Sequence, residues 1–548
     1  QRTADWCGGG RVAHAGRIDV LKYYRWFWSV GDGWNGLHTA LHEGLKQNAR
    51  PGFRTFFDPA VRQPSLSGAG GDVDVLSHWT YTYPDPQRIG LCTDQLFAMA
   101  EAGGKGQEVM KMTQIIWYRS QTAPIGASTE APVPWVDHDP DAAYITISPM
   151  HLREALWTKL SRPVRGIMYH GWQSLVETDS PGAYRYTNPH TQHELKRLVE
   201  EVVEPLGPAL LKIPDTRSDV AFLESFTSQM FARRGGYGSN LGWSADLWLA
   251  LQHAHVRCDV IYEETLLRDG LAGRKFLVMP ECDVLTAPVV KAIAAWQAAG
   301  GKVVADELLC PGLKADLTLA SFRREKKAEL DKAKVLALAA DLGPRLEALG
   351  FVRAVSLDQP EILVRTRHAG EADYHFLIND HRESGTYVGR HGLVMENGLP
   401  SSGTLTFHHD PPAHVYDLLA GREVVRTDPA RLEVAIGPCD GRLYMALPRP
   451  IAGVAITAPA TAQPGETIQV AISVNDPAGK PIPAVIPLLV EIRDSNGRLV
   501  EGSGYRATED GLLRINLDLA KNEDPGMWEI SIRELASRTS AMAAMRVR

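Results

Sequence analysis

Residues 165–172 read Arg-Gly-Ile-Met-Tyr-His-Gly-Trp, a short apolar run that ends in polar and aromatic side chains. Three runs of the same kind precede it, at 53–57, 73–79 and 108–118. Helix-like stretches near 94–102 and 151–160 lie between these runs. Strands that alternate with helices form parallel sheets, and polar and aromatic residues at strand ends are typical of the catalytic face of a (β/α) barrel. The first part of the chain is therefore predicted to supply four strands of such a barrel.

The strands that follow are shorter and more apolar. They are expected at 220–223, 256–261, 276–279 and 302–305. Helices are expected between them at 244–253 and 287–299, and Gly300-Gly301 is a helix stop signal at the end of the second. This pattern predicts a second, smaller, doubly wound α/β domain. The charged stretch 322–350 is expected to be a helix with a solvated face.

The remainder of the chain is rich in short β-strands with turn residues between them. The first group predicts a sandwich, with strands at 361–366, 373–379, 403–408, 413–417, 432–436 and 442–447. Pro448-Arg449-Pro450 is typical of a linker. From 452 to 548 the strands alternate with hairpin turns such as Asp494-Ser495-Asn496-Gly497, which predicts an immunoglobulin-like sandwich.

The predicted fold class is thus multidomain α/β plus β. It combines a partial (β/α) barrel, a flavodoxin-like α/β domain, a helical excursion, a β-sandwich and an immunoglobulin-like sandwich. The corresponding boundaries are 1–205, 206–320, 321–355, 356–450 and 451–548.

Length and composition agree with this organisation and exclude several classes of protein. The chain has 548 residues, which at about 150 residues per domain predicts three to four domains. It is 44% hydrophobic and 22% charged, as folded proteins are. The net charge of −7 comes without a basic tract, which argues against nucleic acid as a partner. No apolar run reaches the roughly 18 to 20 residues that cross a bilayer. The first residue, Gln1, is expected to mark a processed chain or a fragment of a longer one.

Six cysteines are widely spaced and form no CxxC pair: Cys7, Cys92, Cys258, Cys282, Cys310 and Cys439. This spacing argues against a zinc ribbon or a redox motif. Isolated buried thiols are the first interpretation, and one or two disulfides are the alternative.

Three stretches resemble glycoside hydrolase family 42, the β-galactosidases that carry a trimerisation domain. Residues 74–81, followed by Tyr83-Pro84, resemble the sixth barrel strand of that family. Residues 166–174 resemble its eighth strand, and 218–306 resemble its trimerisation domain. The resemblance covers roughly residues 18–450. It implies a retaining barrel that acts on β-linked galactosides or related oligosaccharides, without a cofactor, and a homotrimer.

The resemblance also locates the catalytic groups, and the chain departs from it there. The family nucleophile is a Glu at the end of strand seven, and the matching position here is Thr113 or, one residue later, Gln114. Neither side chain is a carboxylate. The general acid would follow a fourth strand upstream of Gln1, so the missing half of the barrel would come from an upstream segment or a companion chain.

Other candidate residues come from the strand ends themselves. Asp58 ends the first strand and is a candidate for catalysis or substrate binding, whereas Asp74 and Glu108 begin strands and are expected to be structural. Glu177 and Asp179 are candidates for sugar hydroxyls. Aromatic rings stack on sugar rings and polar groups bond hydroxyls, which selects as substrate-binding residues His78, Trp79, Tyr81, Trp117, Tyr169, His170, Trp172 and Gln173.

Two functions remain open on this basis. One is a β-galactosidase-like hydrolase that retains configuration, and the other is an inactive carbohydrate-binding or assembly protein on the same scaffold. No metal site is expected, because His78 and His170 lack a third ligand. Gly235-Gly236-Tyr237-Gly238 lacks the residues of a phosphate loop, and no GxSxG motif indicates an esterase. The immunoglobulin-like end of the chain favours a secreted or periplasmic location.

Overall fold

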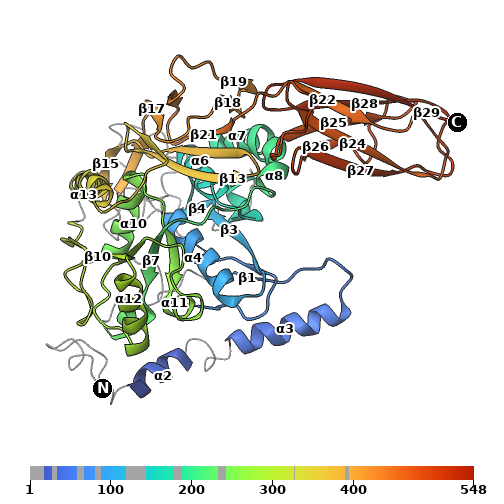
Figure 1. Cartoon of the computed structure of the whole chain (residues 1–548). Coiled ribbons are helices and arrows are strands. Elements are labelled where there is room, and N and C mark those ends of the chain that lie inside the picture. The colour runs from blue at the N-terminus through green and yellow to red at the C-terminus, as the bar shows by residue number, and fades with distance from the viewer. Residues whose placement is uncertain are drawn as a thin grey trace. The chain divides into compact units, whose positions relative to one another are not determined.

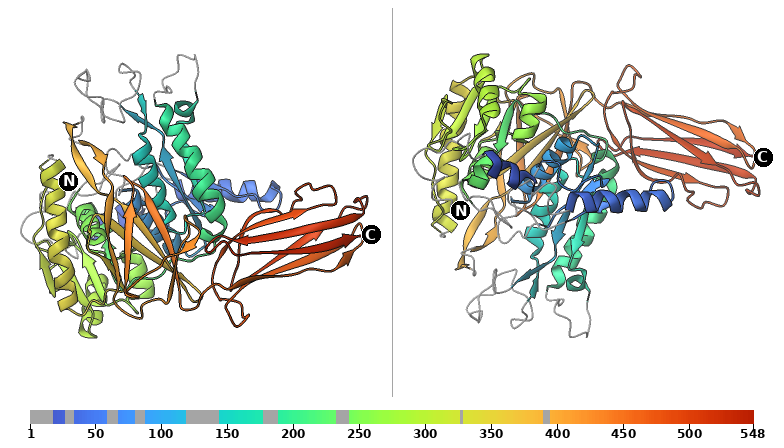
Figure 2. Two further views of the ribbon diagram at one scale, coloured as in Figure 1. Left: turned by 90° about the horizontal axis from the view of Figure 1, so that it is seen from above. Right: turned by 90° about the horizontal axis from the view of Figure 1, so that it is seen from below.

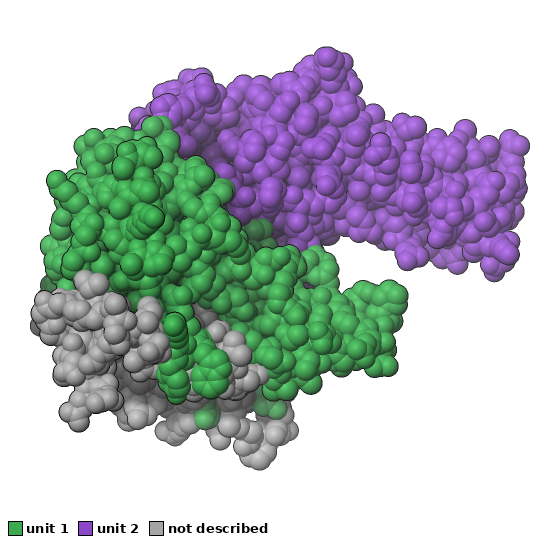
Figure 3. All heavy atoms as spheres, turned by 60° about the horizontal axis from the view of Figure 1, so that its bottom comes forward, with its two compact units in different colours: residues 1–191, 217–353, 381–399 green, residues 192–216, 354–380, 400–548 purple. Residues whose placement is uncertain are grey.

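The computed structural model describes residues 18–26, 34–58, 67–79, 88–118, 144–176, 188–231, 242–325, 328–388 and 394–548. They fall into two compact units (Figure 3). Unit 1 comprises 1–191, 217–353 and 381–399, and unit 2 comprises 192–216, 354–380 and 400–548. The predicted class, α/β followed by β, is confirmed: parallel sheets with helices come first and antiparallel sheets come last.

The first sheet of unit 1 has four strands in the order β1-β2-β3-β6, and every pair is parallel. Its strands are β1 (Phe56–Phe57), β2 (Val75–Leu76), β3 (Glu108–Gln114) and β6 (Gly166–His170) (Figure 1). Two helices pack against β3, namely α4 (Arg88–Gly103) and α6 (Pro149–Leu160). The four parallel strands that the sequence predicted are therefore present, although β1 is only two residues long.

Local sequence explains where α6 begins. Ser148 is its N-cap, and the Ser148 hydroxyl accepts a hydrogen bond from the backbone N–H of His151 at 3.3 Å. Pro149 follows at the first position, where its missing N–H is not needed. The helix therefore starts two residues earlier than the apolar spacing suggested.

Two helices and a hairpin accompany this sheet. The helices are α2 (Ile18–Trp26) and α3 (Trp34–Asn48). After β3 the chain continues as β4 (Ile116–Tyr118), which pairs with β5 (Tyr144–Thr146) in antiparallel fashion.

The second sheet of unit 1 has five parallel strands in the order β11-β10-β9-β7-β8. They are β7 (Val220–Glu224), β8 (Asp259–Tyr262), β9 (Phe276–Met279), β10 (Lys302–Asp306) and β11 (Leu317–Leu319). Helix α10 (Trp243–His253) shares a core with one face, and α11 (Glu263–Asp269) and α12 (Ala287–Ala298) share a core with the other. This is the strand order of a flavodoxin-like sheet.

Unit 1 also contains a long helix and a hairpin that come later in the chain. Helix α13 (Ala328–Ala348) buries Val335, Ala339, Leu342 and Leu346, so the charged stretch is amphipathic. Asp331 is an exception to the expected solvated face, because it is buried and accepts a hydrogen bond from the N–H of Glu325 at 2.7 Å. The hairpin of β15 (Arg382–Val388) and β16 (Val394–Gly398) contacts α13. This hairpin was not predicted from the sequence, which indicated a β-sandwich over the whole range 356–450.

Unit 2 begins at Gln192, inside helix α7 (Pro189–Leu198). It continues with a π-helical turn (Val199–Val203) and α8 (Glu204–Leu210). Two sheets follow, in the orders β12-β17-β20 and β13-β14-β21-β18-β19. Their strands are β12 (Val355–Leu357), β13 (Ile362–Ala369), β14 (Ala372–Asn379), β17 (Ser401–Phe407), β18 (His414–Asp417), β19 (Arg422–Glu423), β20 (Arg431–Ile436) and β21 (Gly441–Leu447). Both sheets contribute to one hydrophobic core.

The last hundred residues form two more sheets, in the orders β22-β24-β27 and β23-β29-β28-β25-β26. Their strands are β22 (Gly453–Thr457), β23 (Thr461–Ala462), β24 (Thr467–Asn475), β25 (Pro487–Arg493), β26 (Gly504–Ala507), β27 (Leu512–Asp518), β28 (Gly526–Glu534) and β29 (Ser540–Val547). Burial alternates along β24 and β28, as in a sheet with one face in a core. This module is elongated along its strands (Figure 2).

Two further expectations concern the chain as a whole. The described cysteines, Cys92, Cys258, Cys282, Cys310 and Cys439, are buried free thiols, which is the first of the two interpretations, and Cys7 lies outside the described residues. A search of the described helices finds none with the length and apolar character of a membrane span.

Candidate functional site

The carboxyl ends of the four parallel strands in unit 1 meet at one edge of their sheet. Asp58 directly follows β1, and Trp79 lies three residues after the end of β2. Gln114 ends β3 and His170 ends β6, and the two are aligned in register. Four of the sequence-predicted residues are therefore brought to one edge.

The two faces of this sheet differ in chemistry, because side chains alternate between them. Thr113 points to the helix-covered face, where its hydroxyl bonds the Nζ of Lys159 from α6. Gln114, the next residue, points to the opposite face together with His170. The two positions that the sequence left open for the family nucleophile are thus distinguished: only Gln114 shares a face with His170.

Two lysines are buried beneath the strand ends on the helix-covered face. The Nζ of Lys111 donates to the backbone oxygen of His78 at 2.6 Å and lies 3.1 Å from His78 Nδ1. Burial lowers the pKa of Lys111 to about 8, although Cys92 and Asp58 oppose that shift. Burial also lowers the pKa of Lys159 well below its ordinary value, and the charge of Lys111 adds to this.

His78 belongs to this buried group, through its contacts with Lys111. Burial, followed by the charge of Lys111, holds the pKa of His78 well below its usual range, so the ring is neutral at neutral pH. Tyr169 is aligned with Thr113, and burial raises its pKa. His78 and Tyr169 are therefore placed to support the strand ends from the helix side.

The opposite face carries an aromatic pair. The rings of Trp79 and His170 stack, with their centroids 5.8 Å apart and their planes 18° from parallel. Trp79 keeps 36% of its surface exposed. An exposed indole face beside a polar ring is a surface on which the C–H groups of a sugar can stack.

Asp58 is fixed against this pair. Trp79 Nε1 donates to Asp58 Oδ2 at 2.9 Å. The other oxygen, Oδ1, is buried and has no hydrogen-bond partner among the described residues. A buried carboxylate oxygen without a donor is a strong acceptor for a ligand hydroxyl.

The residues after β6 extend the surface. Gly171 has a φ of +90°, and a Cβ there would lie 2.9 Å from the side chain of Ile116, so glycine is required at this turn. The turn leads into a short 3-10 helix (Trp172–Leu175). Trp172 is 58% exposed there, and Gln173 is exposed beside it.

Several predicted residues fall elsewhere. Tyr81, Glu177 and Asp179 lie outside the described residues, as does Gly235-Gly236-Tyr237-Gly238, and the side chain of Trp117 is not described. Asp74 and Glu108 lie at the amino ends of their strands, in a pocket away from the strand ends described above. Lys46 Nζ is 2.9 Å from Asp74, and Arg54 pairs with Glu108, which accounts for both carboxylates structurally.

The structure adds residues that the sequence analysis missed. Lys111 stands between Met110 and Met112 within β3, and a lysine between two apolar residues was a usable signal of a specific buried partner. Glu224 ends β7 and Glu263 begins α11, and both side chains are buried. No group of three or more metal-ligating side chains occurs among the described residues.

Comparisons with known proteins give a match at the level of structure only. No protein-family model matches the chain, and no curated protein matches it in sequence. A β-galactosidase from Bacillus circulans sp. alkalophilus matches 77% of this chain and 67% of its own, with 14% identity and a TM-score of 0.49. A β-galactosidase from Halorubrum lacusprofundi matches 74% of this chain and 65% of its own, with 12% identity and a TM-score of 0.44.

Family 42 β-galactosidases, which the sequence resembled, are thus also similar in structure over about 70% of the chain. The chain spans about two thirds of the length of the first solved structures that it matches. An α-L-fucosidase from Paenibacillus thiaminolyticus is similar as well, with 12% identity and a TM-score of 0.46. The match covers 75% of this chain and 71% of the fucosidase chain. A CARDB domain from Pyrococcus furiosus matches 18% of this chain and 86% of its own, with 18% identity and a TM-score of 0.14.

Proposed function

We propose that the chain binds a carbohydrate at the carboxyl ends of β1, β2, β3 and β6, on the second half of a (β/α) barrel. The observation that carries the proposal is the Trp79–His170 stack beside Asp58, whose Oδ1 is buried without a partner. A sugar presents both groups that this surface takes: a C–H face for an aromatic ring and a hydroxyl for a carboxylate. Trp172 and Gln173 would contact further sugar units.

Binding is favoured over hydrolysis because a retaining glycosidase needs two carboxyl groups about 5 to 5.5 Å apart. At the described strand ends Asp58 is the one carboxylate, and it is already bonded to Trp79. Gln114 has the shape of a glutamate but cannot attack an anomeric carbon. The carbohydrate-binding function therefore needs nothing beyond the described side chains.

Hydrolysis of β-linked galactosides is the second candidate, and the position of Gln114 favours it. This residue ends the third strand on the face of the aromatic pair, where a nucleophile would stand. An acid from outside the described strands, supplied by an upstream segment or companion chain, would complete the carboxylate pair after Gln114→Glu.

A glycan array followed by calorimetric titration of the best ligand tests the proposal. Trp79→Ala and Asp58→Asn should each weaken binding by about tenfold. Trp26→Ala is the matched control, because Trp26 is also exposed, at 52%, and lies on α2 away from the strand ends. Affinity that is equal in all three variants would exclude this site.

Turnover of nitrophenyl β-galactosides separates the two candidates. The unmodified chain should not release nitrophenol, and Gln114→Glu should do so only if a second carboxyl group is present. Hydrolysis by the unmodified chain, with retention of configuration, would replace the binding function by the enzymatic one.

A further inference from the structure

A pocket of unit 1 lies at the amino ends of the four-stranded sheet, at the edge opposite the one that carries Trp79 and His170. This amino-end pocket is lined by residues of α3 and of the connections that lead into β1, β2 and β3, namely 42, 46, 52–54, 72–74 and 105–108. Its volume is ≈ 520 Å³, and sites for small molecules have volumes of about 300–1,000 Å³. Strand β3 runs from Glu108 to Gln114, so about 20 Å of sheet separates the pocket from the carboxyl ends of the strands.

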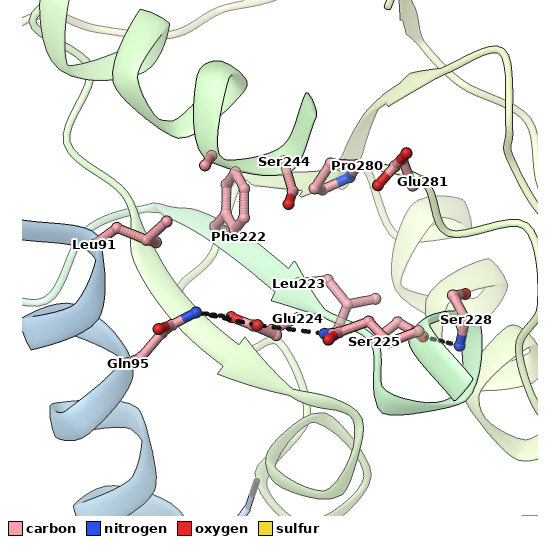
Figure 4. A pocket seen from close by; sticks show the side chains of 12 residues that line it. Leu91, Gln95, Phe222, Leu223, Glu224, Ser225, Ser228, Ser244, Pro280 and Glu281 are labelled. Carbon is pink, nitrogen blue, oxygen red and sulfur yellow. Dashed lines mark hydrogen bonds between the residues drawn. The ribbon is translucent and has the colours of Figure 1, made fainter. Parts of the chain in front are cut away.

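Size distinguishes this pocket from the cavity at the carboxyl edge of the five-stranded sheet. Figure 4 shows that cavity, which lies between Glu224 and Pro280, with Gln95 bonded to Glu224. Its volume is ≈ 30 Å³, which suits one or two water-sized groups. A ligand with a ring of atoms therefore fits the amino-end pocket and does not fit that cavity.

The charged side chains that line the amino-end pocket neutralise one another. Three are cations and three are carboxylates, namely Lys46, Arg54, Lys105, Asp72, Asp74 and Glu108. Lys46 Nζ lies 2.9 Å from Asp74 Oδ1, Lys105 pairs with Asp72, and Arg54 pairs with Glu108. All six side chains are between 25% and 49% exposed, so a ligand can reach them. A ligand with a charge of its own would have to separate one of these pairs.

Hydrogen bonds fix the positions of the lining residues. Asp74 Oδ2 accepts from the backbone N–H of Thr55 at 2.7 Å and from its hydroxyl at 3.2 Å. Lys46 Nζ donates to the backbone oxygen of Phe53 at 2.7 Å, and His42 Nδ1 bonds the Thr55 hydroxyl at 2.7 Å. Helix α3 and the connections before β1 and β2 are thus joined to one another. A lining that is ordered before the ligand arrives loses less side-chain freedom on binding.

The paired side chains keep atoms that can bond a ligand. Lys46 and Lys105 each use two of their three N–H donors, one on an aspartate and one on a backbone oxygen. Arg54 contacts Glu108 through Nη1, which is one end of a guanidinium group with five donors. The ion pairs of Asp72 and Glu108 run through one oxygen each, Oδ1 and Oε2. Donors and acceptors are therefore available side by side.

A hydroxyl group fits beside such a pair better than an ion does. It donates one hydrogen bond and accepts others, so it can bond both the cation and the carboxylate without separating them. Phe53 also lines the pocket and is 40% exposed, and an aromatic ring offers a surface to the C–H groups of a sugar. Neutral ring compounds with several hydroxyl groups combine both features.

We propose that the amino-end pocket binds a neutral polyhydroxylated ring compound, such as a monosaccharide, whose hydroxyl groups bond the Lys105–Asp72 and Arg54–Glu108 pairs. The site lies at the opposite edge of the sheet from the proposed carbohydrate surface and does not depend on it. Trp79→Ala removes the aromatic stack of that surface and changes no residue of the pocket, so the two sites can be tested separately.

Calorimetric titration of the Trp79→Ala chain with glucose, galactose and myo-inositol tests the proposal. At least one of these neutral probes should bind with one site per chain. The uronate and the amino sugar that correspond to glucose and to galactose should bind at least about tenfold more weakly than the neutral sugar, because a charged group has to separate an ion pair. Binding of none of the neutral probes, or equal binding of a charged counterpart, would overturn the proposal.

Further variants of the same chain locate the binding. Lys105→Met should weaken binding of the neutral probe by about tenfold, since it removes a charged donor, and Phe53→Ala should weaken it severalfold. Lys275→Met and Phe56→Ala are the matched controls, because Lys275 forms a similar exposed ion pair, Phe56 is 59% exposed, and neither residue lines the pocket. Lys105 is 47% exposed, so its replacement should leave the chain folded. Equal affinity in Lys105→Met and Lys275→Met would overturn the proposal.

Discussion

The buried ion pair between Asp94 and Arg162 allows a sharp test of what holds α4 and α6 together. Arg162 Nε lies 2.8 Å from Asp94 Oδ1, and Arg162 Nη2 lies 3.1 Å from Asp94 Oδ2, so the contact is bidentate. The two side chains are 4% and 5% exposed. Arg162 also donates to the backbone oxygen of Thr158 and stacks over Trp248 of α10. The pair therefore connects three helices of unit 1.

Asp94→Asn keeps the shape of the side chain but leaves the guanidinium facing a neutral amide. Breaking a buried pair costs about 3–5 kcal/mol, which at roughly 2–4 °C per kcal/mol corresponds to a fall in the unfolding temperature of unit 1 of roughly 6–20 °C. Differential scanning calorimetry of the intact chain measures this fall, because the transition of unit 2 serves as an internal reference.

Asp341→Asn provides the control, since Asp341 forms an exposed i,i+4 pair with Arg345 on α13 in the same unit. Such pairs contribute about 0.3–0.5 kcal/mol, so this transition should barely move. A shift below about 2 °C in Asp94→Asn, or equal shifts in the two variants, would refute the assignment of the pair as a buried link.

Three further changes probe other features. Gly370→Ala should lower the unfolding temperature of unit 2 far more than Gly479→Ala does. Both glycines have a positive φ, but a Cβ at Gly370 would meet the backbone of Pro483, whereas a Cβ at Gly479 would meet nothing. Equal calorimetric shifts in the two variants would contradict this reasoning. The unfolding temperature of Glu224→Gln should rise relative to that of the unmodified chain as the pH of the buffer is raised from acidic to neutral. Burial raises the pKa of the Glu224 carboxyl group above 4.5, so the protonated group stabilises the folded chain fully below pH 4.5, and this stabilisation is lost as the pH rises through the raised pKa. A difference in unfolding temperature that does not change with pH would contradict the raised pKa. Lys159→Met should raise the transition of unit 1, because it removes an amine whose pKa burial holds well below 10.5, and a lower transition would show that the amine is needed.

The order of sheets could be predicted because strand and helix periodicities are local. The first and last residues of several helices and strands could not be predicted from the sequence. Helix α4 begins at Arg88, six residues before the predicted stretch 94–102, and its first turn is buried although it includes the polar Arg88 and the small Gly90, which apolar spacing does not mark. The β15–β16 hairpin has no regular alternation of apolar residues, and its antiparallel partner strand and α13 decide its structure.

The candidate site was predictable as a set of strand ends but not as a set of side-chain directions. Thr113 and Gln114 were equivalent alternatives, since a shift of one residue exchanges the two faces of a strand. Only the contact of Thr113 with Lys159 separates them. For the same reason His78, which the sequence grouped with the sugar-binding aromatics, is found on the face of Lys111.

The chain passes five times between the two units along its length, and this connectivity has a consequence for biosynthesis. Helix α8 buries Leu206, Ala209 and Leu210, and within unit 2 it packs against β25 and β26, which end at Ala507. A ribosome that adds about 5–20 residues per second would need on the order of 15–60 s to reach those strands. During that interval the helix lacks the two strands against which it packs in unit 2. The nascent chain should therefore engage a holding chaperone after α8 emerges and leave it only once the last sheets are complete.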